Sequence, residues 1–144
     1  MKIEKIIELP ADIQYLVSES QVDGFRFLKR LVDEFNSGIN RFDNLGEVLL
    51  AVREQDKLIA IGGINNDNGV ARLRRFYVSK RYRRTGLGSR LLKELEQTAI
   101  KSFSEIVLFT DTSDAGKFYQ SCGYTWVEER GISHRKNLHK NCLL

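Results

Sequence analysis

The sequence predicts a single α/β domain with a mixed β-sheet, and three observations support this fold class. Short apolar runs separated by turn residues follow one another from 47 to 78, which is typical of antiparallel strands joined by hairpins. The stretch from 70 to 110 has the pattern strand, glycine loop, helix, strand, which predicts a parallel βαβ unit. A strongly amphipathic segment at 25–35 predicts a helix that packs on the sheet.

Length and composition fit one globular domain spanning 1–144. With 42% hydrophobic and 29% charged residues, the chain is unlike disordered or membrane-spanning proteins. No apolar run approaches the roughly 18 residues of a transmembrane helix, and the first ten residues lack the apolar core of a signal peptide. We therefore expect a cytoplasmic monomer or homodimer with no membrane partner.

Cysteines, histidines and net charge limit the possible ligands. Cys122 and Cys142 are too few for a disulfide scaffold and lack metal-ligand spacing. His134 and His139 have no partnered carboxylate or cysteine, so we predict surface histidines and no metal site. The net charge of +4 favours an anionic partner, which leaves nucleic acid, nucleotide cofactor and acidic metabolite open.

The N-terminal part is predicted to be mainly helical. Residues 1–9 alternate apolar and charged side chains, as in a half-buried strand, and a short helix follows at 11–20. Asp23 is the expected N-cap of a second helix, with an apolar face formed by Phe25, Leu28, Val32 and Phe35. The stretch 36–46 is rich in Ser, Gly, Asn and Asp and is predicted to be a loop.

The elements after residue 46 are predicted from turn signals and apolar runs. Strands at 47–54 and 58–66 flank a polar turn, and Asn68-Gly69 is a strong hairpin signal before the strand at 70–78. A helix to about residue 101 presents Leu87, Leu91, Leu92, Leu95 and Ala99. The last elements are a strand at 105–110, a short helix capped by Ser113 or Asp114 and ending near Cys122, and strands at 124–129 and 132–138.

The glycine loop before the long helix is suited to an anion, because a helix start offers unpaired N–H groups and the positive end of its dipole. A P-loop would need Gly-Lys-Ser/Thr, but Gly88 is followed by Ser89 and Arg90. A dinucleotide-binding loop would need glycine or alanine at the position of Leu91. The spacing therefore disfavours both of these phosphate-binding loops.

Two motifs resemble those of one enzyme family. The hexapeptide Arg83-Arg84-Thr85-Gly86-Leu87-Gly88 resembles the Q/R-x-x-G-x-G/A signature of the Gcn5-related N-acetyltransferases (GNATs). Downstream, Thr112, Ala115, Phe118, Tyr119, Gly123 and Tyr124 occupy the positions of a second family pattern, N-x-x-A-x-x-F-Y-x-x-x-G-F. The resemblance covers about 47–129 and implies a GNAT-type fold, with a central mixed sheet of six to seven strands and helices on both faces.

The resemblance also implies a ligand and a reaction. Acetyl-coenzyme A would lie between the fourth and fifth strands, with its pantetheine arm on the main chain of Phe76, Tyr77 and Val78. The loop of Arg83, Arg84, Thr85, Gly86, Leu87, Gly88 and Ser89 would hold the pyrophosphate. The acetyl group would pass directly to an amine of a small molecule or protein, and Tyr119 occupies the family position of the acid that protonates the leaving thiolate.

The general base is left open by the sequence. Many relatives carry a glutamate on the fourth strand, whereas this strand reads Arg72-Leu73-Arg74-Arg75. An ordered water or a carboxylate such as Glu47, Glu105 or Asp111 would have to take the proton. Alternation places Arg72 and Arg74 on one face of the strand and Arg75 on the other. If one face lines the acceptor pocket, Arg72 and Arg74 would favour an acceptor that carries a carboxylate or phosphate.

Two other functions fit parts of the sequence. A non-catalytic acyl-coenzyme A sensor would keep the glycine loop but would not need Tyr119. A basic nucleic-acid binder would use the run at 80–84 and would bind with a steep salt dependence. We expect an N-acetyltransferase with acetyl-coenzyme A as donor, no metal and no nucleic-acid partner.

Overall fold

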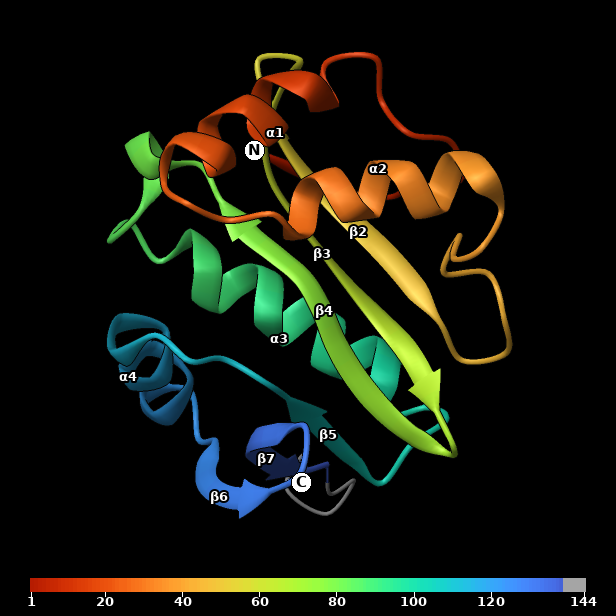
Figure 1. Cartoon of the computed structure of the whole chain (residues 1–144), viewed down its shortest axis with the longest axis vertical. Coiled ribbons are helices and arrows are strands. Elements are labelled where there is room, and N and C mark those ends of the chain that lie inside the picture. The colour runs from red at the N-terminus through yellow and green to blue at the C-terminus, as the bar shows by residue number, and fades with distance from the viewer. Residues whose placement is uncertain (139–144) are drawn as a thin grey trace.

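A computed structural model of the chain describes residues 1–138 as a seven-stranded mixed sheet with the order β1-β2-β3-β4-β5-β7-β6 (Figure 1). The strands are β1 (Lys2–Lys5), β2 (Val48–Glu54), β3 (Lys57–Asp67), β4 (Val70–Val78), β5 (Glu105–Leu108), β6 (Thr125–Glu129) and β7 (Ile132–Asn137). The helices are α1 (Ile13–Val22), α2 (Phe27–Ser37), α3 (Leu87–Ala99) and α4 (Ser113–Ser121), with a short 3₁₀ turn, η1 (Lys80–Tyr82).

Strand pairing confirms the predicted hairpins and the parallel βαβ unit. Strands β1 to β4 pair antiparallel, with turns at Gln55-Asp56 and Asn68-Gly69. Strand β5 then pairs parallel with β4, because α3 carries the chain back across the sheet. Antiparallel β7 and β6 complete the sheet beside β5.

Helices cover both faces of the sheet, as expected, and the period-2 alternation of β2 supplies both cores. Leu49 and Ala51 pack with α1 and α2 on one face. Val48, Leu50 and Val52 pack with α3 on the other face. In Figure 1, α1 and α2 lie in front of β2–β4, whereas α3 lies behind them. Burial on both faces explains why these strands are near-continuous apolar runs.

Two predicted helix caps were wrong. Asp23 ends α1 instead of starting α2, whose N-cap is Arg26, and the Asp23 carboxylate accepts a hydrogen bond from Arg83 at 3.1 Å. Helix α4 follows Thr112, with Ser113 as its first residue. An Asp is favoured as an N-cap in isolation, but here a distant arginine provides a charged partner.

Candidate functional site

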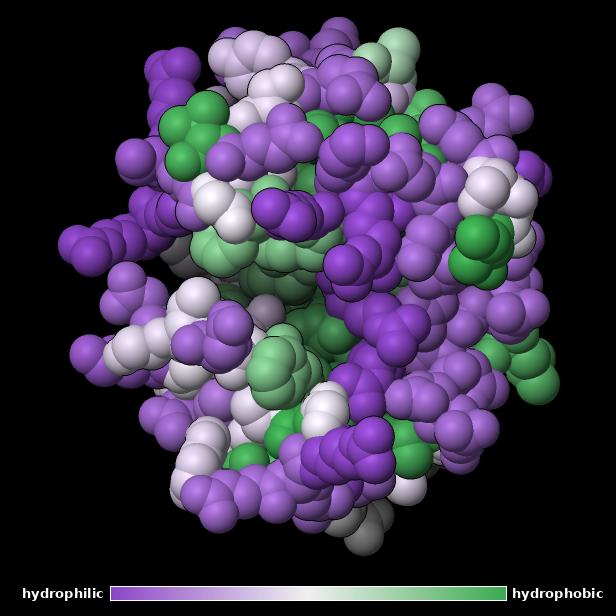
Figure 2. Space-filling view, viewed as in Figure 1, coloured by the Kyte–Doolittle hydropathy of each residue, from purple (hydrophilic) through white to green (hydrophobic). Residues whose placement is uncertain are grey.

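The site begins where two neighbouring strands separate. Strands β4 and β5 pair only at Ala71–Ile106 and Arg72–Val107, although β4 continues to Val78. The β4 edge after Arg72 therefore has no neighbouring strand on the β5 side within residues 1–138. A cleft of about 1000 Å³ occupies this gap. Figure 2 shows the hollow, with an apolar interior and hydrophilic side chains gathered beside it.

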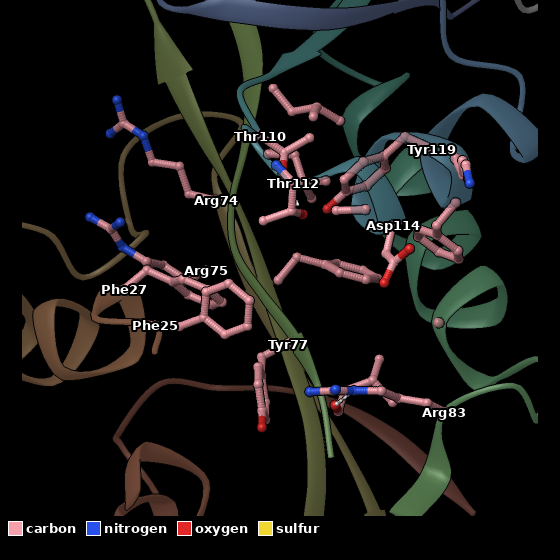
Figure 3. Close-up of a pocket in the computed structure, with 18 of the residues that line it drawn as sticks. Phe25, Phe27, Arg74, Arg75, Tyr77, Arg83, Thr110, Thr112, Asp114 and Tyr119 are labelled. Carbon is pink, nitrogen blue, oxygen red and sulfur yellow. Dashed lines mark hydrogen bonds between the residues drawn. The ribbon is translucent and has the colours of Figure 1, made fainter. Parts of the chain in front are cut away.

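A β-bulge in β4 changes which side chains face the cleft. Arg75 and Phe76 together oppose the single residue Gly62 of β3, and Arg75 has a φ of 58°. Phe76 therefore packs toward α3, while Arg75 reaches Glu34 of α2, with Nη2 donating to Oε1 at 3.0 Å. Arg74 and Arg75 lie on the same side of β4 (Figure 3). The predicted separation of these arginines onto opposite faces was wrong, because the bulge interrupts the alternation.

A loop with free N–H groups lies at one end of the cleft. Gly86 is the N-cap of α3 with a φ of 86°, and the N–H of Arg90 donates to its carbonyl at 3.1 Å. The N–H groups of 84–89 donate to no acceptor within residues 1–138. Buried Leu87 anchors the loop in the core, and the Thr85 hydroxyl donates to the Tyr82 carbonyl. The geometry is that of an anion site at a helix start.

Gly88 allows three elements to approach closely. A Cβ at this position would lie 3.2 Å from the Phe118 ring of α4 and 3.6 Å from Val78 of β4. The neighbouring Ser89 hydroxyl lies 3.7 Å from the Cys122 sulfur at the end of α4. The second glycine of the motif is therefore explained by packing as well as by ligand access.

Arg83 lies across the end of β4. Its Nε donates to the Val78 carbonyl at 3.0 Å, its Nη2 donates to Asp23 at 3.1 Å, and its guanidinium lies 5.2 Å from the Tyr77 ring centroid. The Val78 carbonyl is one of the main-chain groups expected to face the pantetheine arm. Arg83 thus connects the end of α1, the end of β4 and the glycine loop.

Glu19 of α1 accepts hydrogen bonds from residues at and just after the end of β4. Its carboxylate accepts hydrogen bonds from the Tyr77 hydroxyl at 2.6 Å, the Ser79 hydroxyl at 2.9 Å and the Lys80 N–H at 3.0 Å. Burial alone would raise the pKa of Glu19, but these three donors hold it below its ordinary value. No local sequence pattern marks this network, because its members are about 60 residues apart.

Replacing Glu19 by Gln should lower the free energy of unfolding at pH 7 by about 1–3 kcal/mol, because donors to a carboxylate lose a charged acceptor. The pKa of Glu19 is lowered in the folded state, so its stabilisation is present above the unfolded pKa and is lost as pH falls through the folded pKa. Urea unfolding at pH 7 and pH 2.5 measures the difference in unfolding free energy between wild type and Glu19→Gln at each pH. The exposed Glu8→Gln is the control, and an equal difference from wild type at both pH values would contradict the role of the carboxylate.

Tyr119 of α4 lies deep in the cleft. It is only 7% exposed, and its ring packs against Phe76, Phe118 and Tyr124 with centroid distances of 6.1, 5.2 and 5.7 Å. Burial, with a smaller contribution from Cys122, raises the pKa of the Tyr119 hydroxyl. The hydroxyl points into the gap on the side of Thr112 (Figure 3). A buried phenol of this kind stays protonated at neutral pH and is able to donate.

The three carboxylates considered as bases do not line the cleft. Glu47 accepts from the Asn65 side chain and the Asn66 N–H, and Glu105 forms an ion pair with Arg135 at 3.1 Å. Asp111 is exposed outside the cleft lining. Among residues 1–138, the one carboxylate in the lining is that of Asp114, in the first turn of α4.

His134 is buried, so the prediction of a surface histidine was wrong. The residue is 3% exposed, its Nδ1 lies 2.8 Å from the Ser133 hydroxyl, and its ring lies 6.2 Å from that of Tyr119. Burial lowers the pKa of His134, which favours the neutral ring. His139 and Cys142 lie outside the described residues. Among residues 1–138, no group of three His, Cys, Asp or Glu side chains is placed to hold a metal ion.

Phe25 and Phe27 were not recognised as site residues from the sequence. Phe25 lies between α1 and α2, and Phe27 is the first residue of α2. Their ring centroids lie 5.5 Å apart, and both side chains line the cleft beside Arg74 and Arg75 (Figure 3). The helical spacing of Phe25 with Leu28, Val32 and Phe35 predicts a core face, and Phe27 is outside that pattern. The interruption at Gly24, which has a φ of 87°, was the available signal that Phe25 precedes the helix.

Comparisons with known proteins agree on one family. The profile of the acetyltransferase (GNAT) domain matches residues 17–137. A putative acetyltransferase from Exiguobacterium sp. 255-15 has 24% identity and a TM-score of 0.85, covering 94% of this chain and 92% of that one. An aminoglycoside 6'-N-acetyltransferase complexed with coenzyme A has 18% identity and a TM-score of 0.72, covering 96% and 98%.

A third solved structure, PaiA N-acetyltransferase from Thermoplasma acidophilum in complex with coenzyme A, has 20% identity and a TM-score of 0.71. It covers 95% of this chain and 99% of that one. No curated protein sequence matched this chain. At these identities the likeness to solved structures shows the fold, and the family follows from the profile.

Proposed function

The chain belongs to the GNAT acetyltransferase family, and from this premise we propose that it transfers an acetyl group from acetyl-coenzyme A directly to an amine of a small molecule or protein. The observation that carries the proposal is the separation of β4 from β5, with a free N–H loop at one end of the gap and Tyr119 within it. An acyl donor with an anionic head and an extended arm fits this arrangement.

The loop and the strand would hold the donor. The N–H groups of 84–89 and the dipole of α3 would receive the pyrophosphate, with Arg83 and Arg84 adding charge. The main chain of Phe76, Tyr77 and Val78 would pair with the pantetheine arm as an added strand would. Because Arg83 already donates to Val78, its side chain would have to share or release that carbonyl.

The reaction needs a neutral amine and a protonated leaving group. A lysine-like amine has a pKa near 10.4 and must lose a proton. Strand β4 offers no carboxylate, and Asp114 carries the one carboxylate of the described cleft lining. We infer that the proton leaves through water in the cleft. The departing thiolate has a reference pKa near 8.5 and would be protonated by Tyr119, whose own pKa is raised by burial. In this transfer the amine nitrogen attacks the thioester carbonyl and the C–S bond breaks, so the acetyl group passes directly to the amine without a covalent bond to the protein.

Two alternatives make distinct predictions. A non-catalytic sensor would bind acetyl-coenzyme A without turnover, and the position of Tyr119 in the cleft argues against it. A nucleic-acid binder would use the basic run at 80–84, but Arg83 in that run already pairs with Asp23 and Val78.

None of the helices within residues 1–138 has the length and apolar character needed to cross a membrane. The cytoplasmic location and the oligomeric state stay predictions.

One pair of assays tests the proposed function. Acetyl-coenzyme A should raise the melting temperature and duplex DNA should not, since specific binding stabilises the folded state. Thiol release should depend on an added amine, and its rate at low amine concentration should rise about tenfold per pH unit below the amine pKa, as the neutral fraction grows. Donor binding without amine-dependent release would favour the sensor, and a plateau near pH 7 would reveal a protein base.

A further inference from the structure

We propose that the acceptor is an amine that also carries a carboxylate and an apolar body; this inference rests on the acetyl-transfer function proposed above. It comes from one wall of the cleft, formed by Arg74, Arg75, Phe25 and Phe27, which we term the acceptor wall. Figure 3 shows these side chains together on the side of β4 away from Tyr119.

Arg74 is the free cation of the acceptor wall. It is exposed, it lines the cleft, and it has no carboxylate partner within residues 1–138. Arg72, by contrast, is committed to the fold: its Nε donates to Asp67 at 2.8 Å and its Nη1 donates to the Gly131 carbonyl at 2.9 Å. Arg72 also lines the cleft, but these partners hold its guanidinium, and the bulge adds Arg75 to the face that carries Arg74.

Arg75 adds a buried donor that lacks a partner. Its side chain is 11% exposed and its Nη2 pairs with Glu34, but its Nε is buried without any acceptor among the described residues. Burial lowers the pKa of this guanidinium, and the nearby cations Arg74 and Arg30 act in the same direction. The single carboxylate of Glu34 leaves these arginines with an excess of positive charge, which an anionic group on the acceptor would offset.

The aromatic rings define the rest of the acceptor. Phe25 and Phe27 contact each other, and Phe27 lies 6.2 Å from the Tyr77 ring, so an apolar surface adjoins the two guanidinium groups. A molecule with a carboxylate and an apolar or aromatic body would contact both parts of the wall. A polycationic amine would meet like charge there.

The test compares amines that carry a carboxylate with amines in which a neutral carboxamide replaces it. Apolar and aromatic amino acids, each beside its carboxamide, are assayed for acetyl-coenzyme A-dependent thiol release, with spermidine as the polycation. We expect kcat/KM to be at least tenfold higher for the acids, mainly through KM. The amine of an amino-acid amide loses its proton more readily than the amine of the acid, so a larger fraction of the amide is reactive at a given pH. A preference for the acids would therefore have to outweigh this advantage of the amides.

Arg74→Gln should raise KM for the acids about tenfold or more and leave KM for the amides within about twofold. Because Arg74 is exposed and unpaired, this variant should fold normally. The matched control is Lys101→Gln, which removes one exposed positive charge outside the cleft. A charge effect on the whole protein would appear in both variants, whereas a local contact appears only in the first.

The melting temperature with acetyl-coenzyme A separates this inference from the function on which it rests. If the donor does not stabilise the protein, the proposed function fails. If the donor binds but amides or spermidine are acetylated as well as the acids, the carboxylate proposal is overturned. It is equally overturned if no acid is acetylated, or if Arg74→Gln and Lys101→Gln behave alike.

Discussion

Replacing Tyr119 by Phe is expected to lower kcat by about 10- to 1000-fold, which overlaps the lower part of the roughly 100- to 10,000-fold range typical of a general acid. Only the hydroxyl is removed, and the ring keeps its contacts with Phe76, Phe118 and Tyr124. The dissociation constant for acetyl-coenzyme A should change less than about twofold, because the acid acts on the leaving thiolate. Steady-state kinetics and direct titration of the donor measure the two quantities.

Tyr124→Phe is the matched control for this variant. Tyr124 is also buried and belongs to the same ring cluster, but its hydroxyl donates to Glu96 at 2.7 Å and it does not line the cleft. Its loss should reduce the free energy of unfolding by about 1–3 kcal/mol and leave kcat nearly unchanged. If Tyr119→Phe retains full turnover, Tyr119 is a packing residue and the thiolate leaves without help from this side chain.

The order of elements was predictable from the sequence because local signals agreed with the tertiary structure. Asn68-Gly69 forms the predicted turn, and the leucines of α3 are buried in one core. The parallel pairing of β5 with β4 follows from the single crossover helix. The short extent of that pairing, which opens the cleft, has no signature in the spacing of apolar residues.

The errors share a physical cause, which is that distant partners outweigh local preference. A bulge opposite Gly62 turns Arg75 toward Glu34, so simple alternation fails at one position of β4. Burial of His134 depends on α4 crossing over β7, where a Cβ at Gly116 would lie 3.5 Å from its ring. Neither contact can be read from residues within a few positions in sequence.

The second large effect is expected on donor binding at the glycine loop. Gly86→Ala should weaken acetyl-coenzyme A binding about 10- to 100-fold, measured by titration. Gly86 has a φ of 86°, and a Cβ there would meet no atom within 4 Å, so the cost arises from the backbone and not from a clash. An alanine that relaxes toward negative φ would turn the following N–H groups away from the pyrophosphate. Losing one charge-assisted hydrogen bond, worth about 1.5–3 kcal/mol, accounts for that range.

Gly69→Ala separates this effect from general strain. Gly69 has a φ of 89°, also has no atom within 4 Å of a Cβ, and lies in the hairpin between β3 and β4, outside the cleft. Both variants should therefore lose about 1–2 kcal/mol of unfolding free energy, while only Gly86→Ala should lose donor affinity. Equal donor affinity in the two variants would mean that the pyrophosphate does not depend on the N–H geometry after Gly86, and the site would then rest on arginine charge alone.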